Sequence, residues 1–377
     1  MFTICLLIYV LALQPGCRDK YVSPYVSPPT GYLVVEGYIS GNTITQFTLS
    51  RSITLPGDSA IPAESGANVQ IEGSDNSTYP LTELVSGVYS SADTLTLNQA
   101  AQYRLRIHTG NGEDYLSDFA PFKTTPAIDS INWINGSSGV EIYVNTHDPA
   151  ANTRYYQWNW DQTYEYHSAE NTYYVYDRDT IPPQIIPRTE QVYRCWMSAS
   201  SENILVNTSA KLTQDVIYRM PVKNIPPNDI QLGVLYSILV RQYALTEDGY
   251  NFLSLMQNNT ESLGSIFDAQ PSQITGNIHC LTHPTERVIG YVSAGTVQQQ
   301  RIFISRNQVP STYTYSCPLR DTLFQNDPQD IQMNFASGGY TPEYLTDFGT
   351  AWAANRTGCL VCTARGGTNI IPSFWPN

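Results

Sequence analysis

Two cysteines near the end of the chain, Cys359 and Cys362, have the spacing with the clearest chemical potential. A C-x-x-C pair occurs in redox centres, in metal sites and in structural disulfides. A redox centre requires the pair at the start of a helix that follows a strand, because that position lowers the thiol pKa. Here the pair precedes Arg365, Gly366, Gly367 and a tail in which we expect no helix, so the sequence argues against redox catalysis.

A zinc site is the second interpretation of these thiols. The segment HCLTH places His279, Cys280 and His283 at ligand-like spacing, and these side chains would complete a set with the C-x-x-C pair. However, His283 precedes Pro284 in a predicted turn between strands, and packed or solvated histidines are commoner than ligands. We therefore predict no metal and no cofactor.

A structural disulfide is the third interpretation and the favoured one. Two of the seven cysteines lie in the N-terminal segment, and an odd number is left for an oxidising compartment. The five candidates for structural disulfides are Cys195, Cys280, Cys317, Cys359 and Cys362. We expect Cys359 or Cys362 to tie the tail back, with Cys317 or Cys280 as the partner. The connectivity stays open at this stage.

The N-terminal segment predicts export. The apolar run over residues 2–13 is too short to span a bilayer and has the length of a signal-peptide core. Gly16 directly before Cys17 resembles the lipobox of bacterial lipoproteins, in which the cysteine carries lipid. We predict a signal peptide over residues 1–16, lipidation at Cys17 and a Ser/Pro/Tyr-rich tether over residues 17–30.

The charge balance excludes two classes of partner. The chain carries 20 Lys and Arg against 33 Asp and Glu, which gives a net charge of −13. Nucleic acids and anionic membrane surfaces recruit clusters of Lys and Arg, and the sequence has none. We therefore expect no nucleic-acid partner, and membrane attachment only through the lipid.

The hydrophobic pattern predicts a mostly β protein of two domains. Short alternating runs such as LVVEGYIS and AQYRLRIH, separated by Gly, Asn and Asp, favour an immunoglobulin-like β-sandwich over residues 31–123. A larger, β-sandwich-like domain over residues 124–377 follows, with the cysteine-containing tail. One helix is expected within it at residues 246–263, because Thr246 and an acidic first turn precede a broad apolar face.

Motifs of catalysis are absent from the sequence. It contains no G-x-S-x-G, H-E-x-x-H, Walker or G-x-G-x-x-G motif in a fitting context. Acid pairs such as Asp177 with Asp179, or Asp327 with Asp330, satisfy the minimum for a glycosidase, but pairs of this kind arise by chance in nearly any chain. We predict a protein that is not an enzyme, and a hydrolase is the least supported alternative.

Aromatic residues supply the candidates for contact with a ligand or partner. Trp158 and Trp160 alternate on one face of a strand, and we expect that face to point into the core. Two tyrosines follow close after them, and three more lie beyond a turn in an expected exposed excursion, where flat rings with polar tips hold sugars or peptides. The candidate contact residues are Tyr164, Tyr166, Tyr173, Tyr174 and Tyr176.

An ordered series of motifs resembles a known family. The motifs are LVVEGYI, TLSRSITLPGD, TTPAIDSI, RYYQWNW, VIGYVSAGTVQQQRIFI and CLVCTARGGTNIIPSFWP. Their order is similar to that of a lipoprotein family of the Bacteroidota, the domain of unknown function 4249. The resemblance implies an outer-membrane lipoprotein, on the cell surface or the periplasmic face, that assists nutrient import through a TonB-dependent receptor. A surface glycan-binding or adhesion module is the alternative.

Overall fold

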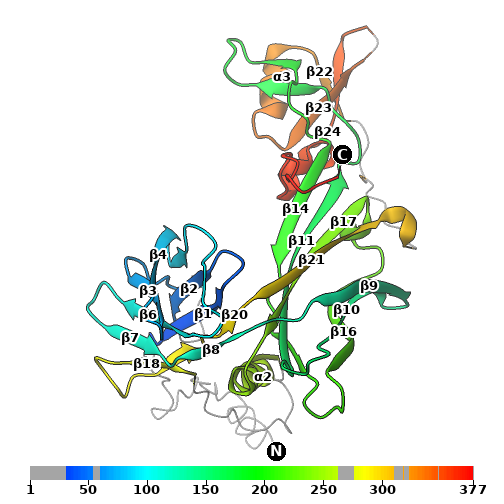
Figure 1. Ribbon diagram of the computed structural model, residues 1–377. Helices are drawn as coiled ribbons and strands as arrows, with labels where there is room; N and C mark the ends of the chain where they lie inside the picture. Colours follow the sequence, from blue (N-terminus) through cyan, green and yellow to red (C-terminus); the bar gives the residue numbers. More distant parts are fainter. Residues whose placement is uncertain are drawn as a thin grey trace, which may run out of the picture.

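The computed structural model describes residues 31–53, 60–261, 276–309, 317, 322–346 and 348–376. The predicted signal peptide, Cys17 and the tether lie outside these residues. The described part of the chain is mostly β, as predicted. Within it, no helix is both long enough and apolar enough to cross a bilayer. Figure 1 shows three bodies: an N-terminal β unit, a long twisted central sheet, and a head at the far end of that sheet.

The N-terminal sheet consists of eight strands from the first part of the chain and three from a later part. The early strands are β1 (Leu33–Ser40), β2 (Gln46–Arg51), β3 (Asn68–Gly73), β4 (Thr78–Val85), β5 (Val88–Ser90), β6 (Gln102–His108), β7 (Asp114–Ser117) and β8 (Ala120–Lys123). The late strands are β18 (Ile278–Cys280), β19 (Val288–Gly290) and β20 (Ala294–Gly295). Alternating side chains of β1, β3 and β6 fill one apolar core, as a half-buried strand pattern requires.

The late strands complete this sheet. β20 pairs with both β1 and β8, and β8 also pairs with β6, so the hydrogen-bonded neighbours close a circuit. β18 extends the edge beyond β7, and β19 runs parallel to β1. Residues 278–295 therefore belong to the sheet of the first predicted unit, although they follow its predicted end at residue 123. Closure of this kind removes exposed strand edges.

The central sheet packs against a smaller outer sheet. The central sheet contains β11 (Tyr155–His167), β14 (Arg194–Ser200), β15 (Leu205–Thr208), β17 (Leu235–Ala244) and β21 (Val297–Ser305). The outer sheet contains β9 (Ile128–Gly136), β10 (Gly139–His147) and β16 (Val216–Ile225). Trp158 and Trp160 lie in the core between them, as predicted. Two short helices, η1 (Ile230–Leu232) and η2 (Arg306–Gln308), flank β17 and β21.

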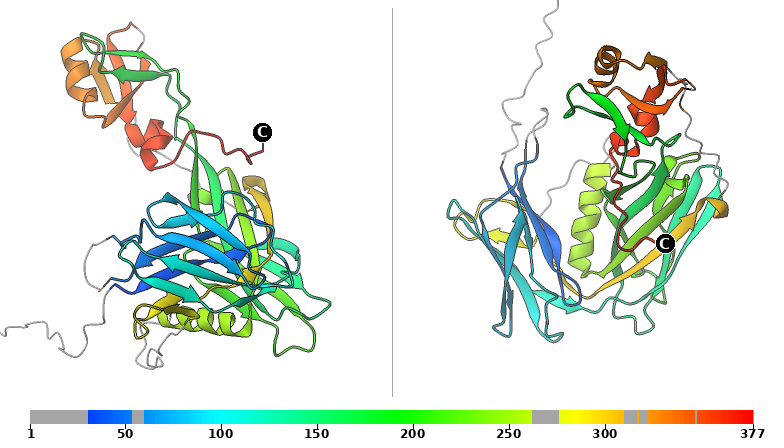
Figure 2. Two further views of the ribbon diagram at one scale, coloured as in Figure 1. Left: turned by 60° about the vertical axis from the view of Figure 1, so that its left-hand side comes forward. Right: turned by 90° about the horizontal axis from the view of Figure 1, so that it is seen from above.

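The predicted long helix is present as α2 (Glu247–Glu261), and residues 262 and 263 lie outside the described residues. The hydroxyl of Thr246 accepts a hydrogen bond from the Gly249 backbone N–H, 3.1 Å away, which is the expected N-cap. Figure 2 shows α2 between the N-terminal sheet and the central sheet when the molecule is seen from above.

The head and the tail form the remaining part. Their elements are β12 (Tyr174–Asp177), β13 (Gln184–Pro187), β22 (Thr322–Gln325), α3 (Pro328–Phe335), β23 (Tyr340–Leu345), β24 (Ala351–Arg356), α4 (Thr357–Leu360) and η3 (Cys362–Arg365). The tail beyond η3 returns along the central sheet (Figure 2). The expectation of no helix after the cysteine pair is wrong, because one 3-10 turn forms there. It ends at Gly366, whose φ of 92° favours glycine.

Candidate functional site

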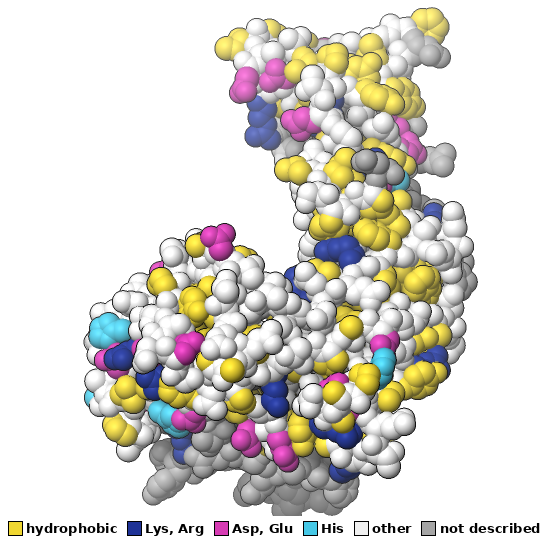
Figure 3. Space-filling view, viewed as in Figure 1, with side chains coloured by type: hydrophobic (Ala, Val, Ile, Leu, Met, Phe, Trp, Pro, Cys, Tyr) yellow, Lys and Arg dark blue, Asp and Glu magenta, His cyan; other side chains and the backbone are white. Residues whose placement is uncertain are grey.

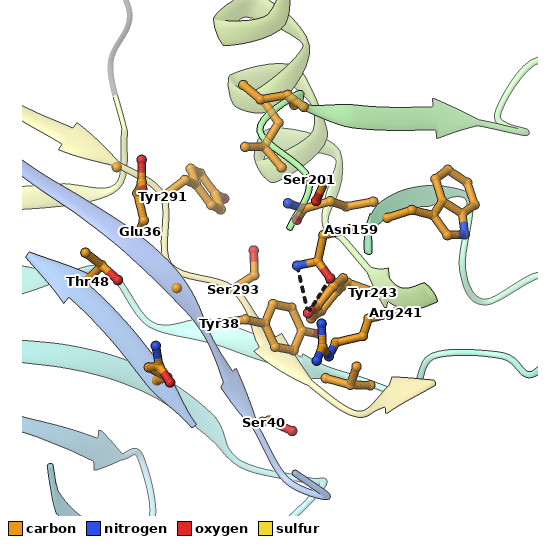
Figure 4. Close-up of a pocket in the computed structure, with 18 of the residues that line it drawn as sticks. Glu36, Tyr38, Ser40, Thr48, Asn159, Ser201, Arg241, Tyr243, Tyr291 and Ser293 are labelled. Atoms are coloured by element: carbon orange, nitrogen blue, oxygen red, sulfur yellow. Dashed lines mark hydrogen bonds between the residues drawn. The ribbon is translucent and has the colours of Figure 1, made fainter. Parts of the chain in front are cut away.

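A cleft of about 800 Å³ lies between the N-terminal sheet and the central sheet. Strands β1 and β2 and the β19–β20 segment form one wall, β11, β17 and β21 form the other, and α2 flanks the space. Figure 4 shows side chains from both walls pointing toward one another. Cavities of this volume hold small organic ligands.

The alternation of side chains along the central strands explains why the wall formed by β11, β17 and β21 is polar. On β11 the even-numbered residues Tyr156 and Trp158 are buried in the core, so the odd-numbered Gln157, Asn159 and Asp161 point to the opposite face. Neighbouring strands continue the polar surface in register, because Asn159 lies opposite Arg241 of β17 and Arg241 lies opposite Gln299 of β21. We call this surface, Gln157, Asn159, Asp161, Arg241 and Gln299, the polar row.

The charges in the polar row are compensated. A guanidinium nitrogen of Arg241 lies 2.5 Å from a carboxylate oxygen of Asp161, and the hydroxyl of Ser200 donates to the other oxygen at 2.8 Å. Burial raises the pKa of Asp161, but the hydrogen bonds from Arg241 and Ser200 outweigh this effect and lower the pKa overall. Asp161 therefore stays ionised and bound to Arg241 at neutral pH.

A tyrosine and an amide lie beside this ion pair. The Asn159 amide nitrogen donates to the Tyr243 hydroxyl at 3.1 Å, as Figure 4 shows. The ring of Tyr38 meets the ring of Tyr243 edge-on, with centroids 5.0 Å apart, and the Tyr38 hydroxyl donates to the Ala244 carbonyl. Burial raises the pKa of Tyr38, and the nearby Tyr243 adds to the shift. Both phenols stay neutral and act as hydrogen-bonding groups.

The wall opposite the polar row carries a second ring. Tyr291 follows β19 and lines the cleft together with Glu36 and Ser293. Its ring packs against Phe252 of α2, with centroids 5.7 Å apart. A Cβ atom at Gly249 would lie 3.1 Å from the Tyr291 ring, so glycine lets the helix approach this closely. The helix thereby fixes one aromatic side of the cleft.

Paired hydrogen bonds join the two walls at their base. The side-chain amide of Asn42 donates to the Val297 carbonyl at 2.9 Å and accepts from the Val297 N–H at 2.8 Å. The hydroxyl of Thr125 accepts from the Ala244 N–H at 3.0 Å. These bonds fix the N-terminal sheet to the start of β21 and the end of β17. The cleft is therefore formed before any ligand enters it.

The described lining residues supply groups that recognise ligands. The carboxylates among the described lining residues are Glu36 and Asp161, and Asp161 is bound to Arg241. The acid pairs noted in the sequence lie elsewhere and act locally: Asp327 caps α3, and Asp177 accepts from the Asp179 N–H. Amides, hydroxyls, one compensated ion pair and aromatic rings are the chemistry of binding.

Four of the five cysteines predicted as disulfide candidates form disulfides, the inclusion of Cys280 is wrong, and the structure supplies the connectivity. Cys195 of β14 bonds to Cys362, and Cys317 bonds to Cys359. Cys280 is buried and has no disulfide partner among the described residues. Both C-x-x-C thiols are in disulfide bonds and therefore cannot bind zinc. In the described ranges, no group of three His, Cys, Asp or Glu side chains has a metal-binding arrangement.

The predicted contact tyrosines divide into two groups. Tyr164 and Tyr166 lie on β11 and are buried in the core cluster of the central sheet, so their prediction as contact residues is wrong. The long strand continues through them, and the tail covers Tyr166, whose hydroxyl donates to the Cys362 carbonyl. The other three belong to the head.

In the head, Tyr174 packs edge-on against Trp352, and Tyr176 stacks on Phe335, so both are partly enclosed. Tyr173 is 68% exposed. Figure 3 shows hydrophobic side chains over the head and over the part of the sheet beneath it. The head therefore keeps one predicted tyrosine open to contact.

Comparison with protein-family models assigns the chain to a family. The model of a family described as Domain of unknown function (DUF4249) matches residues 19–301. The chain belongs to the DUF4249 family. The match includes every residue of the polar row and both walls of the cleft. The tail that contains the C-x-x-C pair lies beyond the matched residues of the DUF4249 model.

Two further comparisons bear on the fold and on relatives. No curated protein matches the chain. Among solved structures, a two fibronectin type-III domain segment from chicken tenascin is similar over 58% of this chain and 94% of that chain, at 9% identity and a TM-score of 0.17. That superposition is too loose to assign a fold.

Sequence reasoning missed the cleft residues Tyr38, Asn159, Arg241, Tyr243 and Tyr291. One signal was present, since Gln157, Asn159 and Asp161 alternate with the aromatic residues of the same strand. That alternation predicts a polar face, which on most strands faces water. The opposite wall comes from residues more than one hundred positions away, and no local pattern pairs the two.

Proposed function

We propose that this protein is a lipid-anchored, non-catalytic binding protein of the outer membrane that assists a TonB-dependent receptor in nutrient uptake. The observation that carries the binding role is the cleft, whose walls are fixed by Asn42 and lined by recognition groups. The anchor and the receptor rest on the lipobox-like Cys17 and on the resemblance described above. Preorganised clefts bind with a smaller entropic penalty.

The proposed layout separates attachment, cargo and partner. An immunoglobulin-like unit over residues 31–123, which residues 278–295 complete, follows the tether, and a larger β-rich unit over the rest of residues 124–377 contains α2 as its helical insertion. The cleft between them would hold the cargo. The head lies far from the tether-proximal unit, and it exposes Phe348 at 97%, Met333 at 68% and Leu323 at 60%. Larger exposed apolar patches mark interaction sites, and Figure 3 shows hydrophobic side chains gathered over the head.

Affinity purification tests the receptor role. The tag is inserted in the loop after Ser86, between β4 and β5, because the C-terminus packs on the central sheet. The full chain is purified from its native membrane in mild detergent, and partners are identified by mass spectrometry. A stoichiometric TonB-dependent receptor is expected. Purification of the chain alone, with lipid confirmed on Cys17, contradicts the proposal.

The second candidate is a surface glycan-binding or adhesion module that works without a transporter. The polar composition of the cleft favours it equally, because a ligand site is needed in either role. A deletion strain separates the two candidates. Loss of uptake with unchanged surface adhesion supports the receptor accessory, and loss of adhesion with unchanged uptake supports the module.

A further inference from the structure

The hydrogen-bonding groups of the cleft are mostly uncharged and of mixed type. Asn159, Gln157 and Gln299 each present a donor and an acceptor, and hydroxyls come from Thr48, Ser201 and Ser293. Gln299 is exposed, and Gln157 and Asn159 are half-buried, so all three are accessible. A ligand that matches such groups carries many hydroxyls, because each hydroxyl also donates and accepts.

The charge of the cleft argues against an anionic ligand. Arg241 is the lining cation, and its guanidinium is bound to Asp161 at 2.5 Å. Glu36 is exposed, forms no ion pair with another described residue, and adds a negative charge. A phosphate, sulfate or carboxylate would have to displace Asp161 and would face Glu36 across the cleft. Neutral ligands encounter neither penalty.

Aromatic rings border the polar groups on both sides. Tyr38 and Tyr243 stand beside Asn159, and Tyr291 stands on the opposite wall (Figure 4). Rings with polar tips pack against the apolar faces of sugar rings while the surrounding amides bind the hydroxyls. A volume of about 800 Å³ is within the range for drug-sized ligands, and therefore accommodates a short oligomer rather than a long chain.

Most of the strands that line the cleft offer a peptide no free edge. Extended peptides commonly add to a free strand edge, where the backbone supplies the affinity. The strands β11 and β17, which carry most of the polar row, are paired on both sides, β11 with β17 and with β14 and β15, and β17 with β11 and β21. β1 is likewise paired with β2 and with β19 and β20. The main chain of these strands therefore offers no open ladder, and β21, which pairs with β17 alone, is bonded at its start by Asn42 through Val297.

From these observations we infer that the cleft binds a short, neutral oligosaccharide, held by the polar row and by the ring of Tyr291. The inference rests on the proposed function, since it names the class of cargo that the cleft would hold. It requires no bond to be broken, because the described lining residues supply binding groups.

The test uses the full chain in a detergent without sugar headgroups, on an array of neutral, sialylated and sulfated oligosaccharides, with a library of short peptides beside it. The best hit is then titrated by calorimetry. We expect neutral oligosaccharides to bind and the charged ones and the peptides to fail. Stronger binding of charged glycans or of peptides overturns the inference, and so does an array without any signal.

Two variants locate the binding. Asn159→Ala removes an amide at the centre of the polar row, and Gln299→Ala removes an exposed amide at its rim, where the fold does not depend on it. Each should weaken binding about tenfold or more, which corresponds to about 1.4 kcal/mol. Asn135→Ala, an exposed amide at the end of β9, is the matched control. Unchanged affinity in both variants, with a normal melting temperature, overturns the assignment to this cleft.

The outcome is separable from that of the receptor proposal. If the chain co-purifies with a TonB-dependent receptor but binds no oligosaccharide, the proposed function stands and this inference is rejected. If the chain binds oligosaccharides through Asn159 but retains no receptor, this inference stands and the receptor role is rejected.

Discussion

The indole N–H of Trp375 donates a hydrogen bond to a carboxylate oxygen of Glu165, 3.1 Å away, although 210 residues separate the two. Glu165 is buried and also binds Arg194 and His167, each at 2.8 Å. The Trp375 ring packs edge-on against Trp196 and Phe303. One buried carboxylate thus fastens the tail to the central sheet.

Removal of this charge should destabilise the protein. In Glu165→Gln the side chain keeps its size, but the ion pair with Arg194 and the charge-assisted bond from Trp375 are lost. We expect the free energy of unfolding to fall by about 1–3 kcal/mol, measured by urea denaturation. The matched control is Glu170→Gln, an exposed residue nearby, which should change little. Equal stability of both variants would show that Glu165 does not fasten the tail to the central sheet.

The stability that Glu165 contributes should depend on pH. Burial raises the pKa of Glu165, but hydrogen bonds from His167 and Arg194 outweigh it and lower the pKa to about 2. A lowered folded pKa means that ionised Glu165 stabilises the fold above its unfolded pKa of about 4.3. That contribution disappears as the pH falls toward 2. The stability difference between wild type and Glu165→Gln should therefore be constant near pH 7 and shrink below about pH 4. A difference that grows on acidification contradicts the assignment.

The disulfides make a separate prediction about the tail. Cys195 and Cys362 close a loop of 167 residues, and such long loops restrict the unfolded chain strongly. The double variant Cys195→Ser/Cys362→Ser should lose about 2–5 kcal/mol of stability. Peptide mapping without reduction should recover the pairs Cys195 with Cys362 and Cys317 with Cys359. Cys280 should react with an alkylating reagent only after unfolding, because it is buried.

The base of the cleft gives a prediction about rigidity. Asn42→Ala removes both hydrogen bonds to the Val297 backbone, at a cost of about 1–2 kcal/mol. Hydrogen exchange at Val297 should become faster, since its N–H loses its acceptor, while the core of β3 keeps its protection. Asn135→Ala should leave both regions unchanged. No change at Val297 in Asn42→Ala would show that other contacts hold the walls.

The sequence predicted those features that depend on local periodicity. Alternation placed Trp158 and Trp160 in the core, and the cap at Thr246 located α2. The C-x-x-C pair was interpreted as a staple because it lacked the surroundings of a redox or zinc site. These predictions need only the residues within one strand, one turn or one motif.

Features that depend on distant contacts were not predictable. The connectivity of the cysteines depends on how β14 meets the tail, and the closing strands β18, β19 and β20 are too short to be assigned to a sheet by their pattern. The burial of Tyr166 depends on the tail, which covers it from a distant part of the chain, so the local sequence does not predict it. The cleft itself combines a polar face of β11 with loops near β1 and β20, and periodicity gives the faces without their neighbours.

A photo-crosslinker in the cleft tests the central claim most directly. Benzoylphenylalanine replaces Ile44, a cleft-lining residue that is 48% exposed, and in a parallel strain it replaces Leu84 of β4, which is 66% exposed and lies outside the cleft. Cells growing on their nutrient source are irradiated, and the chain is recovered for mass spectrometry. The account predicts an adduct from position 44 and none from position 84. Equal yields, or an adduct from position 84 alone, would contradict the cleft as the binding site.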